Sequence, residues 1–348
     1  MKEPKFMELP REVWMGPGVL GKIVSVCQRL PLGEKALVVD DPKTYKIAGE
    51  RICRLLRRAN FDVEHVEIRR ADMETVKTVQ ELTKNGVAFL IGVGGGTCID
   101  VAKFASFRER KPYISVPTAA THDGIASSRA SIKGRDRPTS IKAQAPIAIV
   151  ADTLIIKRAP HRLLAAGCGD VIANYSAVYD WELAFKLGKE SYSEYAAALS
   201  KMSAKLVMKN AEIIGRHTEE SVRKVVKALI SSGVAMSIAG SSRPASGSEH
   251  LFSHALDMIA PRPALHGEQC GVGAIMMTCL QGNDWRPIRD ALKKIGAPTN
   301  AEELGIEPKY IIEALTIAHE IRPERYTVLR DGLDAREAER LAKETGVI

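Results

Sequence analysis

The sequence predicts an α/β domain with a parallel sheet, followed by an all-helical domain. In the first part of the chain, short apolar runs typical of buried strands alternate with segments of helical periodicity, as expected for βαβ units. Beyond about residue 159, nearly every segment has helical spacing. A chain of 348 residues is long enough for two domains, which we place at residues 1–158 and 159–348.

The elements of the first domain follow from these alternating patterns. A hairpin with a basic tip is expected at residues 131–142, where the apolar runs give way to polar residues. The helix before Gly86 ends where glycine favours a C-terminal cap. We expect strands at residues 35–40, 62–68, 87–93, 113–116 and 147–152, and helices at residues 19–30, 47–59, 72–85 and 98–108.

The second domain shows only helical patterns. No internal repeat or low-complexity segment interrupts them. We expect helices at residues 170–187, 191–214, 219–239, 246–259, 266–281, 285–295, 308–318 and 334–345.

Composition excludes several classes of protein. Hydrophobic residues make up 45% and charged residues 26%, as in soluble globular proteins. No apolar run approaches the about 18–20 residues of a membrane span, so we expect no membrane insertion. Six cysteines without a CxxC pair indicate buried thiols in a reducing cytoplasm.

The formal net charge of +8 is spread along the chain without a basic run. Nucleic-acid binding would require a basic stripe interleaved with aromatic residues or a known module, so we expect no such partner. Two explanations remain for the charge. It attracts a small anionic ligand, or it is simply a solvated basic surface.

A glycine-rich turn follows the most apolar strand. Gly94, Gly95, Gly96 and Thr97 connect that strand to a helix. Consecutive glycines let a ligand approach the backbone, and the N–H groups at the helix start favour a phosphate, with Thr97 as a helix cap. The alternative is a tight turn that binds nothing.

Asp40 ends the first expected strand, at the sheet edge where ligands bind. There it could accept hydrogen bonds from a coenzyme ribose, and an acid at this position favours NAD over NADP. Lys43 could offset the repulsion of a 2′-phosphate, so the choice stays open. The alternative is a plain turn residue before Pro42.

Three histidines are candidate metal ligands. His250 and His254 are four residues apart, on one face of an expected helix, and His266 opens the next apolar segment after a proline-containing connection. Imidazole suits Zn²⁺, and catalytic zinc sites typically have three protein ligands and an open position. The alternative is that they are ordinary polar residues at a helix–helix corner.

Five motifs resemble one superfamily of enzymes in their order and spacing. They are GGGTCID at residues 94–100, PTAATHDG at 117–124, GCGD at 167–170, SGSEHLFSH at 246–254 and HGEQ at 266–269. Together they resemble the iron-containing alcohol dehydrogenases, glycerol dehydrogenases and dehydroquinate synthases. Within that superfamily they most resemble the archaeal sn-glycerol-1-phosphate dehydrogenases.

The resemblance implies a dehydroquinate synthase-like fold, with a Rossmann-like NAD(P)-binding domain and an all-α metal- and substrate-binding domain. It implies that Asp170, His250 and His266 hold one Zn²⁺. It also implies that Asp123 and His254 are catalytic residues at the substrate, which Asp170 contacts too, so His254 is not a ligand. The implied coenzyme contacts are Gly94, Gly95, Gly96, Thr97, Cys98, Ile99, Asp100, Thr118, Ala119, Ala120, Thr121 and Ser127.

The activity implied is reduction of dihydroxyacetone phosphate to sn-glycerol 1-phosphate by NADH or NADPH, the first step of archaeal membrane phospholipid synthesis. A homo-oligomer, dimer or octamer, is implied as well. The alternatives are a glycerol or other polyol dehydrogenase, a dehydroquinate synthase-like lyase and a non-catalytic nucleotide-binding protein. The cations available for the substrate phosphate are Arg129, Lys133, Arg162 and Arg262.

Overall fold

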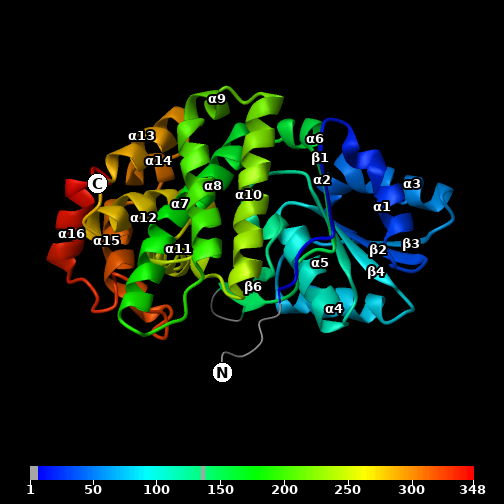
Figure 1. Ribbon diagram of the computed structural model, residues 1–348, viewed down its shortest axis with the longest axis horizontal. Coiled ribbons are helices and arrows are strands. Elements are labelled where there is room, and N and C mark those ends of the chain that lie inside the picture. The colour runs from blue at the N-terminus through cyan, green and yellow to red at the C-terminus, as the bar shows by residue number, and fades with distance from the viewer. Residues whose placement is uncertain (1–6, 135–137) are drawn as a thin grey trace. The chain divides into compact units, whose positions relative to one another are not determined.

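The computed structural model describes residues 7–134 and 138–348. The chain forms two compact units, residues 1–120 with 124–161, and residues 121–123 with 162–348. The first contains a parallel sheet with helices and the second is helical (Figure 1). The expected fold class is therefore confirmed. The expected basic tip of the hairpin, at residues 135–136, lies outside the described residues.

A six-stranded parallel sheet forms the centre of the first unit, in the order β1-β8-β5-β4-β2-β3. The edge strand β1 was not predicted, because it is short and only partly buried. A separate antiparallel hairpin joins β6 and β7. The strands are β1 Glu12–Gly16, β2 Lys35–Asp40, β3 Asp62–Glu67, β4 Phe89–Gly94, β5 Tyr113–Pro117, β6 Arg129–Lys133, β7 Pro138–Lys142 and β8 Ala148–Asp152.

Helices cover both faces of this sheet. Successive strand side chains point to opposite faces, so Val38 packs with α1 and α3, whereas Val39 packs with α4 and α5. This double burial explains why the strands read as continuous apolar runs. The helical segments are η1 Val19–Lys22, α1 Ile23–Arg29, α2 Pro42–Thr44, η2 Tyr45–Gly49, α3 Glu50–Arg58, α4 Met73–Thr83, α5 Gly96–Arg108, η3 Asp123–Ile125 and α6 Thr153–Lys157.

The strand order reverses between β2 and β4. From β2 the chain moves outward to β3, and from β4 it moves in the opposite direction to β5 and β8. Gly92 pairs with Val39 on one side, and Gly94 pairs with Pro117 on the other. The loops after β2, β4 and β5 therefore meet at one edge, the topological switch point where such sheets bind ligands.

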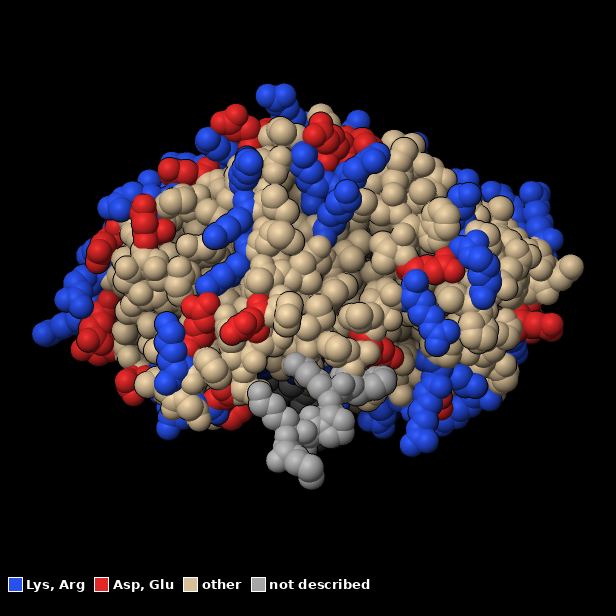
Figure 2. Space-filling model, in the orientation of Figure 1, with Lys and Arg blue, Asp and Glu red and all other residues tan. Residues whose placement is uncertain are grey.

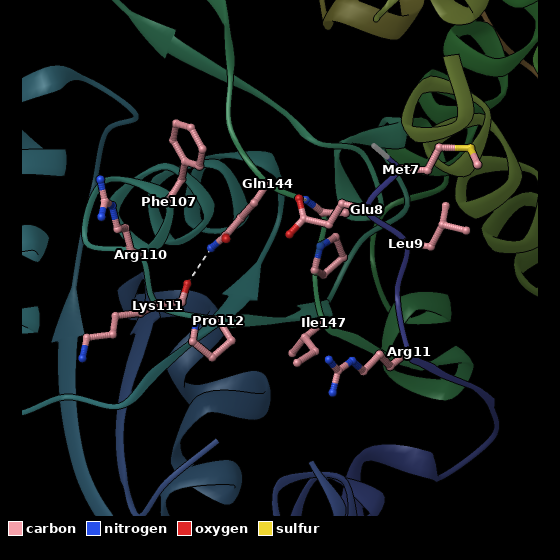
Figure 3. Close-up of a pocket in the computed structure, with 12 residues that line it drawn as sticks. Met7, Glu8, Leu9, Arg11, Phe107, Arg110, Lys111, Pro112, Gln144 and Ile147 are labelled. Carbon is pink, nitrogen blue, oxygen red and sulfur yellow. Dashed lines mark hydrogen bonds between the residues drawn. The ribbon is translucent and has the colours of Figure 1, made fainter. Parts of the chain in front are cut away.

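A cavity of about 540 Å³ lies at the opposite edge of the same sheet (Figure 3). Arg11, Pro112 and Ile147, which line it, directly precede β1, β5 and β8. The amide of Gln144 points toward the main chain, where it donates to the Lys111 carbonyl at 2.6 Å. This cavity is thus remote from the switch point.

The second unit consists of helices packed in pairs. α8 lies beside α10 (Figure 1), and α11 packs against α12. Its helical segments are α7 His161–Lys186, α8 Glu194–Lys209, α9 Ala211–Gly215, α10 Glu219–Ala239, η4 Arg243–Ala245, α11 Ser248–Ile259, α12 His266–Leu280, α13 Arg286–Ile295, α14 Ala301–Leu304, α15 Pro308–Ile317, η5 Ala318–Glu320 and α16 Ala335–Glu344.

Most predicted helices of this unit are present, with three differences. α7 begins at His161 rather than at residue 170, and the expected helix 191–214 is two helices, α8 and α9. The short α14 was not predicted. The early start of α7 was missed because Gly167 and Gly169 disfavour helix, but tertiary packing outweighs that propensity here.

Charge is mixed on the face of the molecule that Figure 2 shows. Lys and Arg side chains are interspersed with Asp and Glu on the face shown in Figure 2. Among the described residues, no helix combines the length and the apolar character that crossing a membrane requires.

Candidate active site

Asp170 is the centre of a buried cluster in the helical unit. It lies on α7 with only 3% of its surface exposed. Its Oδ2 accepts a hydrogen bond from the Asp123 main-chain N–H at 2.9 Å. Its Oδ1 is 3.7 Å from His250 Nε2 and 3.8 Å from His266 Nε2. One carboxylate oxygen is therefore held by the backbone, and the other faces two imidazoles.

Glycines bring α7 and α12 close enough for this arrangement. A side chain at Gly169 would overlap the Gly267 carbonyl oxygen, and one at Gly267 would overlap the Ala166 carbonyl oxygen. Gly271 also approaches the Gly169 Cα atom. The contact of these backbones places Asp170 beside His266 at the start of α12. The GCGD and HGEQ motifs are therefore two sides of one helix crossing.

His250 is oriented by the residue before it. Glu249 is fully buried, and its Oε1 lies 2.9 Å from His250 Nδ1 and accepts from the Gly247 N–H. With Nδ1 donating to Glu249, the lone pair of His250 is on Nε2, which lies 3.7 Å from Asp170 Oδ1. A carboxylate that fixes the tautomer of a ligand histidine is a common support of metal sites.

His266 is oriented in the same way from α11. Its Nδ1 lies 3.1 Å from Ser253 Oγ, which also accepts from the Gln269 amide at 3.0 Å. Donation from His266 Nδ1 to Ser253 leaves Nε2 free to bind an ion. Ser253 and Gln269 were not singled out from the sequence, because nothing in their spacing signals a contact with His266.

Burial sets the protonation of the cluster. Burial lowers the pKa of His250 well below its usual value, and the neighbouring His254, Arg325 and Arg322 lower it further. Burial likewise lowers the pKa of His266, with His250 and His254 adding to the effect. Both imidazoles are therefore neutral, the form that binds a metal ion. Burial raises the pKa of Asp170 well above its usual value, so a bound cation would supply the missing counter-charge.

The donor atoms fit a divalent ion. Zinc bonds of about 2.0–2.2 Å place two tetrahedral ligands roughly 3.4 Å apart. The separations of 3.7 and 3.8 Å are close to that value and too long for hydrogen bonds. The cluster also contains Cys270, whose sulfur lies within 4.8 Å of the other three donors. Sequence reasoning treated Cys270 only as a buried thiol, although its position one turn after His266 was a usable signal.

His254 belongs to a neighbouring group. It lies within 4.8 Å of Asp257 and His266 through their donor atoms, and its ring stacks on that of His266 at 5.6 Å. It is absent from the group around Asp170. The first interpretation, in which His250 and His254 both bind one ion, is therefore not the arrangement found.

Asp123 is held by a directional hydrogen-bond chain. The Asn174 amide donates to Ser232 Oγ at 2.9 Å, so the Ser232 hydroxyl is left to donate to Asp123 Oδ2 at 2.8 Å. Asn174 and Ser232 are both fully buried. This support comes from α7 and α10 and had no signal in the sequence.

In the α/β unit, the glycine loop presents main-chain groups rather than side chains to a potential ligand. Gly95, not Thr97, is the N-cap of α5, and no side chain caps it. No atom lies within 4 Å of a Cβ built on Gly95. By contrast, a side chain at Gly94, where φ is +154°, would press on Cys98. The loop therefore combines internal packing with an open N-terminus that suits a phosphate.

Several side chains implied as coenzyme contacts are buried. Cys98 and Ile99 are fully buried, and Ser127 is 1% exposed. Asp100 receives Lys103 Nζ at 2.9 Å and the Ser131 N–H at 3.0 Å, so both of its oxygens have partners within the protein. Thr97 is exposed, whereas Thr118, Ala119 and Ala120 are buried, and Thr121 belongs to the helical unit. Their contacts with a coenzyme stay predictions, and main-chain groups are the better placed donors.

Asp40 differs from expectation. Its carboxylate is fully buried at the end of β2, with Oδ1 2.8 Å from His65 Nε2, and the His65 ring stacks on Tyr45. Burial raises the pKa of Asp40 to about 6, against an opposing effect of His65. A ribose contact stays a prediction, for a carboxylate that is fully buried and whose Oδ2 has no hydrogen-bond partner among the described residues. Its partner His65 lies on the neighbouring strand β3.

The basic residues of the helical unit also differ from what the sequence led us to expect. Arg162 forms a two-point ion pair with Glu268 at 2.7 and 2.8 Å, and Glu268 also accepts from the Leu265 N–H at the start of α12. Arg162 is thus engaged in structure. Arg322 and Arg325, which the sequence did not single out, lie close enough to lower the pKa of His250.

Comparison with known proteins gives a consistent result. The family model described as iron-containing alcohol dehydrogenase matches residues 14–160. Glycerol-1-phosphate dehydrogenase [NAD(P)+] of Methanosarcina acetivorans is 60% identical over 345 residues, covering 99% of this chain and 97% of that protein. The enzyme of the same name from Thermococcus sibiricus is 60% identical over 344 residues, with 98% of each chain covered.

The fold has solved counterparts as well. A glycerol dehydrogenase from Schizosaccharomyces pombe superimposes with a TM-score of 0.83 at 20% identity, covering 99% of this chain and 91% of that one. At such identity the likeness concerns the fold. The full-length relatives show that this chain belongs to the glycerol-1-phosphate dehydrogenase family.

Proposed function

We propose that this protein reduces dihydroxyacetone phosphate to sn-glycerol 1-phosphate with NADH or NADPH, using a zinc ion held by Asp170, His250 and His266. Full-length relatives at about 60% identity that carry this enzyme name support the substrate. The single structural observation that carries the chemistry is the buried cluster of one carboxylate and two neutral imidazoles.

Different residues of the chain have different roles in the proposed reaction. When bound, the metal ion supplies a Lewis acid for the substrate ketone and the reduced nicotinamide supplies the hydride. Asp170, His250 and His266 would hold the ion. The Asp123 N–H, Glu249 and Ser253 hold those ligands in orientation.

A proton must reach the oxygen that becomes the new hydroxyl. His254 and Asp123 are the candidates, directly or through a substrate hydroxyl and water. His254 stacks on the ligand His266 without sharing its cluster. The main-chain N–H of Asp123 donates to Asp170, one of the proposed metal ligands. Asp123 therefore contacts that ligand and also presents its own carboxylate.

We propose that the coenzyme binds at the β2–β4 switch point, with its diphosphate at the N-terminus of α5. The open environment of Gly95 supports this placement. The choice between NAD and NADP is left to measurement, because Asp40 is paired with His65. We also propose a cytoplasmic homo-oligomer. Six free cysteines fit a reducing compartment, and α8 exposes Tyr195, Met202 and Leu206.

Coenzyme oxidation tests the activity. Purified protein is mixed with NADH or NADPH and dihydroxyacetone phosphate, and the product is offered to an enzyme specific for sn-glycerol 3-phosphate. We expect oxidation and a product that this enzyme rejects. Turnover with glycerol but not with dihydroxyacetone phosphate would identify a polyol dehydrogenase. Inertness toward both, with coenzyme retained, would favour a lyase.

Metal exchange tests the ion. Chelator treatment should abolish activity, and Zn²⁺ should restore it. Parallel reconstitution with Fe²⁺ without oxygen separates zinc from iron, which the description of the matching family model names. Full activity in protein shown to be metal-free would end the metal-dependent proposal.

A further inference from the structure

Lys103 is a fully buried lysine to which the proposed function gives no role. It lies on α5, the helix whose N-terminus we assign to the coenzyme diphosphate. Its Nζ donates to Asp100 Oδ1 at 2.9 Å, to the Gly124 carbonyl at 2.8 Å and to the Arg129 carbonyl at 2.6 Å. An ammonium group has three N–H donors, so all of them are used inside the protein.

These contacts do more than balance charge. Asp100 alone would neutralise the buried ammonium, and a buried ion pair by itself adds little stability compared with apolar residues of similar volume. The other two acceptors are main-chain carbonyls in the segment between residues 124 and 129. Asp100 Oδ2 also accepts from the Ser131 N–H at 3.0 Å. The pair of Lys103 and Asp100 therefore holds the main chain of residues 124–131 against α5.

Gly124 directly follows Asp123, a candidate proton donor. The Asp123 N–H donates to Asp170, and the Asp123 carboxylate accepts from Ser232. Asp123 is the last residue of the segment that belongs to the helical unit, and the chain enters the α/β unit at Gly124. The main chain is thus fixed before the Asp123 side chain by Asp170 and after it by Lys103.

We propose that Lys103 is a positioning residue for Asp123, which acts by fixing the main chain at Gly124 and Arg129. It does not contact the coenzyme or the substrate, because its ammonium is buried and has no donor left for a ligand. The role of Asp123 rests on the proposed function, whereas the anchoring of residues 124–129 does not. One side chain on the helix assigned to the coenzyme therefore sets where the acid lies.

A double-mutant cycle with Asp100 separates positioning from charge balance. Lys103→Met removes the three donors and leaves a buried carboxylate unpaired, so both Tm and kcat should fall. Lys103→Met with Asp100→Asn removes both charges, and the new amide oxygen can still accept from the Ser131 N–H. We expect the double variant to recover most of the Tm but to keep a kcat about 10- to 100-fold below wild type. Metal content and coenzyme affinity should be unchanged in it.

Hydrogen exchange measured by mass spectrometry gives a readout that needs no activity. Peptides covering residues 121–129 should exchange faster in the double variant than in the wild type, while peptides from α7 and α10 keep their protection. Arg108→Met is the matched control, because it removes a positive charge from an exposed position on the same helix. It should match the wild type in both kcat and exchange. If Lys103→Met does not fold, the double variant decides.

The outcomes separate this proposal from the proposed function. Recovery of both Tm and kcat in the double variant would show that Lys103 only balances Asp100, and would overturn the proposal. Weaker coenzyme binding with an unchanged kcat at saturation would place Lys103 in the coenzyme site instead. Unchanged exchange at residues 121–129 would overturn the anchoring. Faster exchange there, with a wild type that does not reduce dihydroxyacetone phosphate, would support the anchor and overturn the proposed function.

Discussion

The two proposed ligand-binding regions of this protein use glycine in opposite ways. In the α/β unit, Gly95 opens space at the start of α5, and the groups presented to a ligand are main-chain N–H groups. In the helical unit, Gly169 and Gly267 lie directly against the backbone of the facing helix. This close contact of α7 and α12 brings the side chains of the cluster together. The proposed coenzyme site is made of backbone groups, and the candidate metal site is made of imidazole and carboxylate side chains.

This difference predicts how each region responds to mutation. Side chains of the α5 motif such as Cys98 and Ile99 are buried in the core, so their replacement should act through packing. Replacement of a cluster side chain should act on the metal ion itself. Separate measurements of stability, metal content and coenzyme affinity can therefore test whether the two regions differ in this way.

The largest effect is expected in the cluster. His266→Ala should lose the metal ion and reduce activity at least about 1,000-fold, because it removes a donor atom. His254→Ala should keep one ion per chain and lower kcat about 100- to 1,000-fold through proton transfer. Metal analysis with steady-state kinetics checks both. Equal metal loss in the two variants would return His254 to the ligand set.

Gly267→Ala should be the next most severe change. The added methyl would overlap the Ala166 carbonyl, and two helix backbones cannot yield as a flexible side chain can. We expect a loss of about 3 kcal/mol in the free energy of unfolding, together with weaker metal binding. Denaturant unfolding measures it. Gly21→Ala, with no atom within 4 Å of the new methyl, is the control.

Gly95→Ala should leave stability nearly unchanged and weaken coenzyme binding. The backbone at Gly95 is extended, with φ −84°, and the methyl meets no protein atom. Its methyl would instead occupy space needed by a phosphate, so we expect coenzyme affinity to fall about 10-fold or more, or about 1.4 kcal/mol. Fluorescence titration measures this. Unchanged affinity would remove the α5 N-terminus from the coenzyme site.

Ser232→Ala should lower kcat about 10-fold while leaving metal content intact. The change removes the hydroxyl that donates to Asp123 and leaves Asn174 without its acceptor, a loss of about 1–2 kcal/mol. Ser237→Ala is the matched control on α10, because Ser237 Oγ has no hydrogen-bond partner among the described residues. Equal kinetics in both variants would show that Asp123 needs no such support.

Strands that are buried on both faces could be predicted from the sequence. β2 and β4 were found because both of their faces are apolar, whereas the edge strand β1 was missed because it is only partly buried. The start of α7 was missed because its glycines pack against α12, a long-range contact that local propensity does not encode.

The residues of the candidate site also divide into those that could be predicted from the sequence and those that could not. Asp170, His250 and His266 could be named through motif resemblance, but their supports could not. Asn174 and Ser232 are polar residues inside apolar helices, and their role appears only once α7 and α10 are placed with Asp123. Asp40 ended a strand as expected, yet its burial against His65 depends on β3 lying beside β2.

That burial gives the smallest effect, on stability against pH. The pKa of Asp40 is about 6 in the fold, against about 3.9 in an unfolded chain, so the folded state holds more protons between these values. Stability is therefore lost as the pH rises from about 4 through 6. Asp40→Asn lacks the titrating carboxyl. Its free energy of unfolding relative to wild type should rise by about 1 kcal/mol between pH 4.5 and pH 5.5. Denaturant midpoints at the two pH values measure this, with the exposed Asp62→Asn as control. A difference of the opposite sign would mean that the ion pair with His65 outweighs burial.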